Sequence, residues 1–302
     1  MQKILRTLII IAMLITGYLL ILAWRDDYTN VNKPVAITPT TTAVSSNDVP
    51  VAGASNTPTG DMPTATATTP TAPTTQQTGA QLISVMTDKY DIRINPVGGD
   101  VVYAALREHA QTLDSNQPFV LLQEDSNRVY VAQSGLIGAN GIDNSNGRAT
   151  FTAPSNQFVM QPNQAELVVP LTYQKDGVTV IKSYKFTKGQ YPINVSYNIT
   201  NNGTQPWQGQ KYAQLKRDNS EDPGKGDKGA ISLSTYLGGA WGTPDQPYNK
   251  LKFGDFNEGL KASSDKGWIG MVQHYFVTAW IPKNYTANFY SREAGKYHII
   301  GF

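Results

Sequence analysis

Short β-rich runs separated by turn residues fill residues 81–302, and this punctuation constrains the fold more than any other feature of the chain. In "KYDIRINPVGGDVVYAAL", Tyr90, Ile92 and Ile94 alternate with polar side chains before a Pro/Gly turn. Alternation with a period of two is typical of strands that bury one face. Such runs recur every eight to twelve residues or so, without a convincing long amphipathic helix. The pattern therefore favours a mainly β domain, either a sandwich or a barrel.

Two hairpins are the clearest local signals in this domain. The segment 166–186 carries two β-rich stretches around Asp176-Gly177, and Asp-Gly is a strong turn signal. The segment 191–207 repeats the pattern with a turn at Asn202-Gly203 and places Val195, Tyr197 and Ile199 on one face. Further strands are expected over 118–123 and 128–136. The segment 100–114 is expected to be a strand followed by a loop, with a short helix as the alternative.

Residues 1–27 predict a membrane anchor. Lys3 and Arg6 precede a charge-free run that is just long enough, with its flanks, to cross about 30 Å of hydrocarbon as a helix. Basic residues before the run and two aspartates after it place the N-terminus in the cytoplasm. A cleavable signal peptide is the alternative, but no small-residue cleavage motif closes the run, so an uncleaved signal anchor is favoured. The expected anchoring side chains are Leu8, Ile11, Leu14, Tyr18, Leu22 and Trp24.

Residues 28–80 predict a disordered linker rich in threonine, proline and alanine. No aromatic residue occurs between Tyr28 and Tyr90, and charges are sparse. Such a stretch has too little apolar surface to offset the entropy of ordering it. A glycosylated stalk is the alternative, but nothing in the sequence indicates a glycosylating host.

Charge and cysteine content exclude several classes of function. The formal net charge is only +2 and no basic cluster stands out, so no nucleic-acid partner is expected. The chain has no cysteine, which excludes disulfides, thiolate metal sites and cysteine nucleophiles. A cysteine-free chain is also compatible with an exported bacterial protein.

Three other features could indicate a binding or catalytic site, but the residues present do not support one. Residues 218–229 lack the glycine and carboxylate of a calcium loop and the Gly-Lys-Ser/Thr of a phosphate loop, so a solvated surface loop is expected. The glycine cluster 238–242 is better explained by a turn or bulge than by phosphate binding. A sugar-epimerising site would need a histidine beside an acid such as Glu166 or Glu258, and nothing indicates this. Neither metal, cofactor nor catalytic residue is expected; the three histidines are His109, His274 and His298.

The stretch 268–282, "WIGMVQHYFVTAWIP", decides the class of protein. As a membrane span it is too short and carries Gln273-His274 at its centre. As a catalytic element it depends on one histidine without a partner. As strands it fits well, because β-branched and aromatic residues dominate and a proline ends it. We therefore expect sheet.

This stretch, extended to 266–282, also resembles a motif of the periplasmic domain in Gram-negative YidC membrane insertases. Five further segments resemble that family in the same order: "INPVGGDV" (94–101), "QPFVLLQE" (117–124), "YVAQSGLIG" (130–138), "STYLGGAW" (234–241) and "NFYSRE" (288–293). The anchor and the linker also occupy the expected places. The resemblance implies that the motif residues are structural: Gly98, Gly99, Asp100, Gly135, Trp268, Tyr275, Phe276, Trp280 and Pro282.

The resemblance implies a β-supersandwich distantly similar to galactose mutarotases, and a non-enzymatic role in inserting inner-membrane proteins. The implied partners are Sec translocon components, nascent inner-membrane proteins and the lipid bilayer, and insertion also proceeds without Sec. The family's five further membrane helices have no counterpart in these residues. We therefore expect a truncated insertase that does not insert proteins by itself, with an incomplete domain over 81–302 whose last strand lacks partners. A membrane-anchored carbohydrate-active enzyme and an unrelated periplasmic binding module remain the alternatives.

Overall fold

The computed structural model describes residues 81–112, 115–144, 147–223, 236–273 and 275–302, together with residues 13, 15, 16, 18, 19 and 21. Tyr18 is helical, whereas the other five predicted anchor residues and the linker 28–80 lie outside the described residues. Within the described part of the chain, no helix has the length and apolar character needed to cross a bilayer. The described residues from 81 onward belong to one compact unit.

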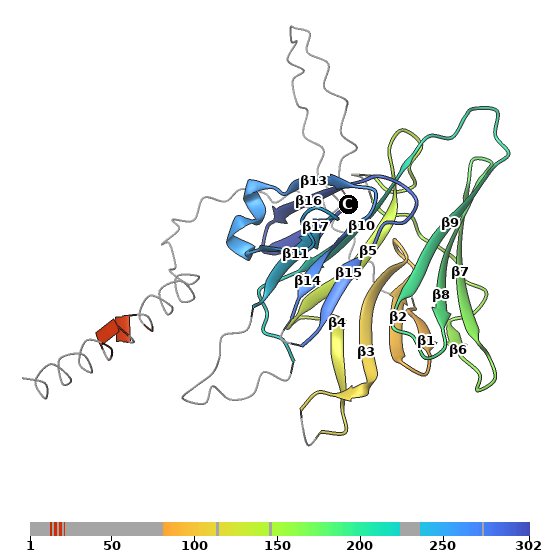
Figure 1. Cartoon of the computed structure of the whole chain (residues 1–302). Helices are drawn as coiled ribbons and strands as arrows, with labels where there is room; N and C mark the ends of the chain where they lie inside the picture. The colour runs from red at the N-terminus through yellow and green to blue at the C-terminus, as the bar shows by residue number, and fades with distance from the viewer. Residues whose placement is uncertain are drawn as a thin grey trace, which may run out of the picture. The chain divides into compact units, whose positions relative to one another are not determined.

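Strands make up nearly all the regular structure of this unit (Figure 1). Ten of them form one sheet in the order β13-β16-β17-β10-β5-β4-β3-β2-β1-β6, in which β1 and β6 run parallel and the other neighbouring strands run antiparallel. These strands are β1 (Ile83–Met86), β2 (Tyr90–Asn95), β3 (Asp100–Ala110), β4 (Pro118–Glu124), β5 (Val129–Ile137), β6 (Gln157–Val159), β10 (Gln210–Arg217), β13 (Lys261–Ser264), β16 (Ala287–Ala294) and β17 (Tyr297–Gly301).

Two smaller sheets accompany the large one. The first has the order β7-β8-β9, and the second has the order β12-β11-β14-β15. A 3₁₀ helix, η1 (Phe253–Glu258), follows β12. The strands are β7 (Glu166–Lys175), β8 (Val178–Thr187), β9 (Ile193–Asn201), β11 (Gly238–Gly242), β12 (Asn249–Leu251), β14 (Trp268–Val272) and β15 (Val277–Trp280).

Both small sheets pack against the same face of the ten-stranded sheet. A Cβ added to Gly239 of β11 would lie 2.8 Å from Ile300 Cδ1 of β17, so these strands are in close contact. Ile300 lies in register with Leu215 and Ala132, on the face that also carries Ser134, whose hydroxyl accepts a bond from Tyr197 of β9. The result is a mainly β, sandwich-like arrangement with one apolar core contributed by all three sheets.

The β7–β8 hairpin and the predicted strands are confirmed, but the second predicted hairpin, with its turn at Asn202-Gly203, is wrong. β9 pairs with β8, and the next strand, β10, belongs to the ten-stranded sheet. β7 and β8 flank Asp176 and Gly177, whose φ angles of 50° and 78° fit the primed turn that Asp-Gly favours. In β9 the partly buried residues alternate as predicted, with Val195, Tyr197 and Ile199 on one face. The segment 100–110 is a strand, as expected.

Two further expectations about the strands are wrong. The glycine cluster 238–242 is not a turn or a bulge but strand β11, an inner strand that pairs with β12 and β14. The last strand does not lack partners, because β17 pairs with β10 on one side and β16 on the other. Phe302 also exchanges two backbone hydrogen bonds with Ala213.

Candidate functional site

The turn between β2 and β3 places a carboxylate in the protein interior. Gly98 and Gly99 have φ angles of 75° and 62°, a left-handed conformation that glycine adopts without strain. The turn delivers Asp100 to the first position of β3, where only 6% of its surface is exposed. Burying a carboxylate is costly unless it is paired and hydrogen-bonded.

Arg148 supplies that pairing. Its Nη1 and Nη2 donate to Oδ2 and Oδ1 of Asp100, both at 2.9 Å, in the bidentate geometry that makes such pairs strong. Nη2 also donates to the carbonyl of Ser134 at 3.1 Å, and Nε lies 3.2 Å from Oδ1 of Asp143. Burial is the largest single effect and lowers the pKa of Arg148, but the interactions with Asp100, Tyr212 and Asp143 together outweigh it, and the net shift is upward.

Gly135 in β5 permits a second carboxylate to approach. A Cβ at this position would lie 1.8 Å from Oδ2 of Asp143, well inside contact distance. Asp143 uses the space to accept backbone hydrogen bonds from Leu136 at 3.2 Å and Ala149 at 3.0 Å. The glycine is therefore required by a close approach to Asp143.

Lys182 brings a second cation from the three-stranded sheet. It lies in β8, is fully buried, and donates from Nζ to the carbonyls of Gly98 and Ser134, each at 2.9 Å. Its ammonium also lies 5.4 Å from the ring centre of Tyr184, a cation–π distance. Burial lowers the pKa of Lys182 to about 7, with Asp100 acting in the opposite direction.

Asp100, Asp143, Arg148 and Lys182 together form what we call the buried charge network. It contains two carboxylates and two cations, and each carboxylate oxygen already accepts a hydrogen bond. Lys182 joins β8 to the β2–β3 turn and to β5 of the large sheet. The arrangement holds two sheets in one relative position, and its carboxylates are committed to internal partners.

A second buried ionic cluster centres on Asp222. Its Oδ1 accepts from Gln273 Nε2 at 2.7 Å and lies 3.3 Å from Arg217 Nη2 and 3.5 Å from Arg128 Nη2. The expectation of a solvated loop over 218–229 is therefore wrong at this position, because the Asp222 side chain is 10% exposed. Residues 224–229 lie outside the described residues.

The motif residues after β11 shape a hairpin, β14–β15. Trp268 begins β14, Trp280 ends β15 and packs against the core, and Pro282 is buried just beyond. In the connecting turn, the ring of Phe276 lies 4.3 Å from that of Phe119, whereas Tyr275 is 81% exposed. The turn thus presents one aromatic ring to solvent and buries most of another.

The described histidines have structural contacts. His109 Nε2 lies 3.1 Å from the hydroxyl of Tyr191, and His298 stacks on Phe253 with ring centres 4.4 Å apart. His274 lies outside the described residues. Within the described ranges, neither histidine has a contact with Glu166 or Glu258, and no group of three or more metal-ligating side chains forms.

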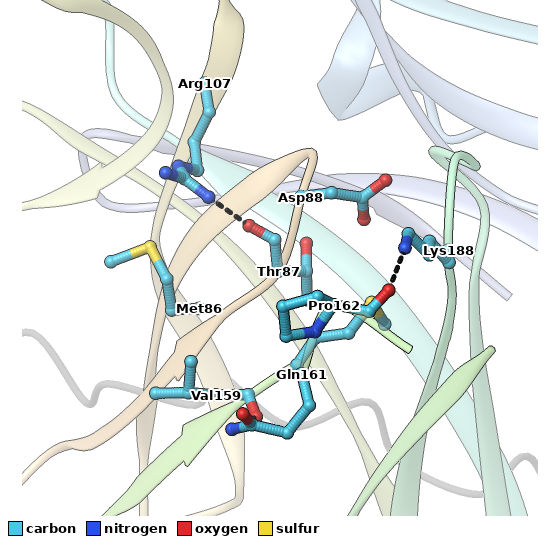
Figure 2. A pocket seen from close by; sticks show the side chains of 9 residues that line it. Met86, Thr87, Asp88, Arg107, Val159, Gln161, Pro162 and Lys188 are labelled. Carbon is cyan, nitrogen blue, oxygen red and sulfur yellow. Dashed lines mark hydrogen bonds between the residues drawn. The ribbon is translucent and has the colours of Figure 1, made fainter. Parts of the chain in front are cut away.

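A cavity of about 390 Å³ lies beside the β1–β2 turn, where β6 and the end of β8 approach it (Figure 2). Apolar and charged side chains line it together. Oδ2 of Asp88 accepts from the backbone of Gly189 at 2.6 Å, whereas its buried Oδ1 has no hydrogen-bond partner. The lining residues are Met86, Thr87, Asp88, Arg107, Val159, Met160, Gln161, Pro162 and Lys188.

Sequence reasoning missed Arg148, Asp143 and Lys182, although one signal was present. In "VTVIKSYKF", Lys182 occupies the same alternating face as Val180 and Tyr184, which predicts an inward-facing lysine. Arg148 and Asp143 lie in an irregular segment without periodicity. Their pairing with Asp100 depends on tertiary contacts that the local sequence does not encode.

These features define a class: a β-sandwich-like domain whose buried charges fix the positions of its sheets, with aromatic and apolar side chains at its surface. Comparison with known proteins narrows this class. Residues 82–302 match a family model described as the YidC periplasmic domain.

Similarity to individual curated proteins indicates the same family. The chain is 40% identical to the membrane protein insertase YidC of Shewanella frigidimarina, with 98% of the chain and 52% of the relative aligned. It is 39% identical to that of Alcanivorax borkumensis (96% and 52%) and 38% identical to that of Hahella chejuensis (99% and 54%). The chain therefore belongs to the YidC membrane protein insertase family. It spans about half the length of these curated relatives.

Proposed function

We propose that these residues supply the membrane anchor and periplasmic domain of an insertase that assists the insertion and folding of inner-membrane proteins. The match of residues 82–302 to the YidC periplasmic domain carries this proposal. The charge-free run from Leu8 to Trp24 supports it, because such a run fits an anchor in the inner membrane. The lysine and arginine before the run favour a cytoplasmic N-terminus.

The domain's proposed role is binding rather than bond-making chemistry. The internal pairing of Asp100 and Asp143 supports this, because both carboxylates are committed to Arg148 and to backbone groups. The proposed partners are nascent inner-membrane proteins, the bilayer and Sec translocon components, with Sec-independent insertion as a second route. We propose a supersandwich of the mutarotase type as the finer description of the fold, since both small sheets cover one face of a large sheet.

Reporter fusions test the orientation. Alkaline phosphatase joined after residue 302 is active only outside the cytoplasm, whereas green fluorescent protein joined there fluoresces only inside. We expect an active phosphatase, no fluorescence and a membrane-bound product that alkaline carbonate does not extract. A fluorescent fusion, or release of the whole product into the soluble periplasm, would contradict the anchored topology.

Photo-crosslinking tests the binding role. A photoreactive amino acid at Tyr275, which is 81% exposed on the β14–β15 turn, reports what this surface meets during synthesis of a reporter membrane protein. We expect adducts with the reporter or with a translocon subunit. A photoreactive residue at Leu171, fully buried in β7, is the matched control and should give none. Adducts only with soluble periplasmic proteins would favour an unrelated binding module.

A further inference from the structure

We propose that the cavity beside the β1–β2 turn binds a phosphate diester that carries a primary ammonium two carbons away. The cavity is formed by the β1–β2 turn, the residues after β6 and the end of β8, with Arg107 of β3 beside them (Figure 2). Its volume of about 390 Å³ lies at the small end of the range for ligand sites. The site goes beyond the insertase role proposed above and depends on the lining residues alone.

Asp88 requires a hydrogen-bond donor. Its Oδ2 accepts from the backbone nitrogen of Gly189 at 2.6 Å, whereas its buried Oδ1 has no hydrogen-bond partner among the described residues. A buried carboxylate oxygen without a hydrogen bond is destabilising. A charged N–H group forms the strongest bond to such an oxygen, and a primary ammonium supplies one.

Arg107 and Lys188 favour an anion in the same cavity. Arg107 Nη1 donates to the carbonyl of Thr87 at 2.5 Å, and Lys188 Nζ donates to the carbonyl of Pro162. Both side chains are exposed, so their remaining N–H groups can donate to a ligand. Over the residues that the structure describes, neither cation forms an ion pair with a carboxylate. Phosphate oxygens are acceptors that arginine and lysine bind well.

Apolar side chains interspersed with these charges determine the spacing of the ligand's own charges. Met86, Val159 and Met160 line the same cavity, and Val159 is 55% exposed although it lies in a strand. Because polar and apolar side chains lie close together here, the ligand carries its two charges close together on a short hydrocarbon. Methionine side chains are flexible and adapt to small apolar groups. Two methylene groups between the ammonium and the phosphate meet this requirement.

Simpler ions match only part of the cavity. Inorganic phosphate leaves Asp88 Oδ1 without a donor. A lone ammonium meets the positive charges of Arg107 and Lys188 and is repelled by them. The aminoethyl phosphate group serves all three side chains at once. It occurs in the headgroup of phosphatidylethanolamine and in soluble glycerophosphoethanolamine, so the test has one arm for each source.

Methionine-methyl NMR tests the soluble source on the full chain reconstituted in phosphatidylcholine nanodiscs. Glycerophosphoethanolamine should shift the methyl signals of Met86 and Met160 on titration. The signal of Met271, fully buried in β14, is an internal control and should stay in place. Glycerophosphocholine is the matched control ligand: it carries the same charges, but its methylated nitrogen cannot donate to Asp88. It should leave the two signals unmoved, as should inorganic phosphate.

The lipid source is tested by exchanging the nanodisc lipid. With phosphatidylethanolamine in the nanodisc and no soluble ligand, the same two signals should shift if the headgroup reaches the cavity from the bilayer. Signals that move with glycerophosphoethanolamine but not with this lipid would assign the site to the soluble diester. Either result agrees with the proposed ligand chemistry.

Two variants test the assigned contacts. Asp88→Asn keeps an acceptor for Gly189 but replaces Oδ1 by an amide donor, and it should weaken glycerophosphoethanolamine binding about tenfold or more. Lys188→Gln removes one exposed cation and should weaken binding about fivefold. The control is Lys185→Gln, at a lysine of β8 that pairs with Glu166 and does not line the cavity, and binding should be unchanged.

Several outcomes would overturn the proposal. They are an absent shift with glycerophosphoethanolamine, an equal shift with glycerophosphocholine, a full shift with inorganic phosphate, or undiminished binding in Asp88→Asn. A full shift with phosphate would show an adventitious ion only. If the fusion and crosslinking experiments succeed while these signals stay unmoved, the proposed function stands and this site is wrong.

Discussion

At the scale of single residues, the domain depends on positions where a side chain would collide with a charge. Gly135 is the clearest case, because it opens the space that Asp143 fills. Asp143 in turn lies against Arg148, which holds Asp100. A side chain at Gly135 would therefore displace Asp143 and disturb the pairing of Arg148 with Asp100.

Gly135→Ala should lower the free energy of unfolding by about 1–3 kcal/mol, because the added methyl group must displace Asp143. Urea denaturation followed by tryptophan fluorescence measures the change. Gly254→Ala is the matched control: a Cβ there has nothing within 4 Å, and unfolding should be unaffected. Equal effects of the two substitutions would refute the role assigned to the close approach.

Lys182 should make stability depend on pH. Its folded-state pKa of about 7 lies below the value near 10.5 that an exposed lysine has. Between these values the unfolded chain binds a proton that the folded chain has released, so stability rises with pH. Well below pH 7, Lys182 is protonated in both the folded and the unfolded chain, so its contribution to stability no longer changes with pH.

Comparison with Lys182→Met isolates the effect. The wild-type chain should gain stability relative to the variant between pH 7 and pH 9, by at most about 1.4 kcal/mol per pH unit. Urea unfolding at a series of pH values measures this difference. Curves that stay parallel over that range would show that Lys182 keeps its ordinary pKa.

At the scale of strands and hairpins, prediction succeeded where the signal is local. The β7–β8 hairpin follows from Asp176-Gly177 and the alternation around it. β11 was missed because Gly238, Gly239 and Gly242 are typical of turns, and only the flanking strands make them sheet. The role of Asp222 was missed for a similar reason, since two of its three partners, Arg128 and Gln273, lie far away in sequence.

Asp222→Ala should detach the β14–β15 turn from the ends of β5 and β10. It removes the carboxylate shared by Gln273, Arg128 and Arg217 and leaves two buried guanidinium groups uncompensated. We expect a loss of about 3–5 kcal/mol in unfolding free energy. The exposed Asp245→Ala serves as the control, with an expected change within about 0.5 kcal/mol. If the two variants gave the same denaturation curve, Asp222 would not be what holds the β14–β15 turn to the ends of β5 and β10.

At the scale of the whole molecule, the family could be identified from ordered motifs, whereas the contacts behind those motifs could not. The glycines of "INPVGGDV" and "YVAQSGLIG" lie beside a network of which only Asp100 falls in a recognised segment. Asp143, Arg148 and Lys182 lie outside these segments. A match in sequence shows that positions correspond. It does not reveal which charges are buried beside them.

A fragment that begins at Gln81 should give a far-ultraviolet spectrum dominated by β structure, because strands and one short 3₁₀ helix are the regular elements described there. Circular dichroism measures this directly. A fragment beginning at Ile92, which removes β1 and the start of β2, is the comparison and should lose cooperative unfolding. A helix-dominated spectrum for the longer fragment would be incompatible with the three sheets.

The pairing of β10 between β5 and β17 has a consequence for how the domain is made. β10 is synthesised well before β17, so its second edge stays open until residues 297–301 have emerged. Contacts so distant in sequence form slowly, and open edges invite association with other chains. The ten-stranded sheet is therefore completed last, and the pairing that completes it, between β10 and β17, lies inside the sheet and not at its edge. A newly made chain passes through a period in which its core strands are exposed to the very segments it is proposed to assist.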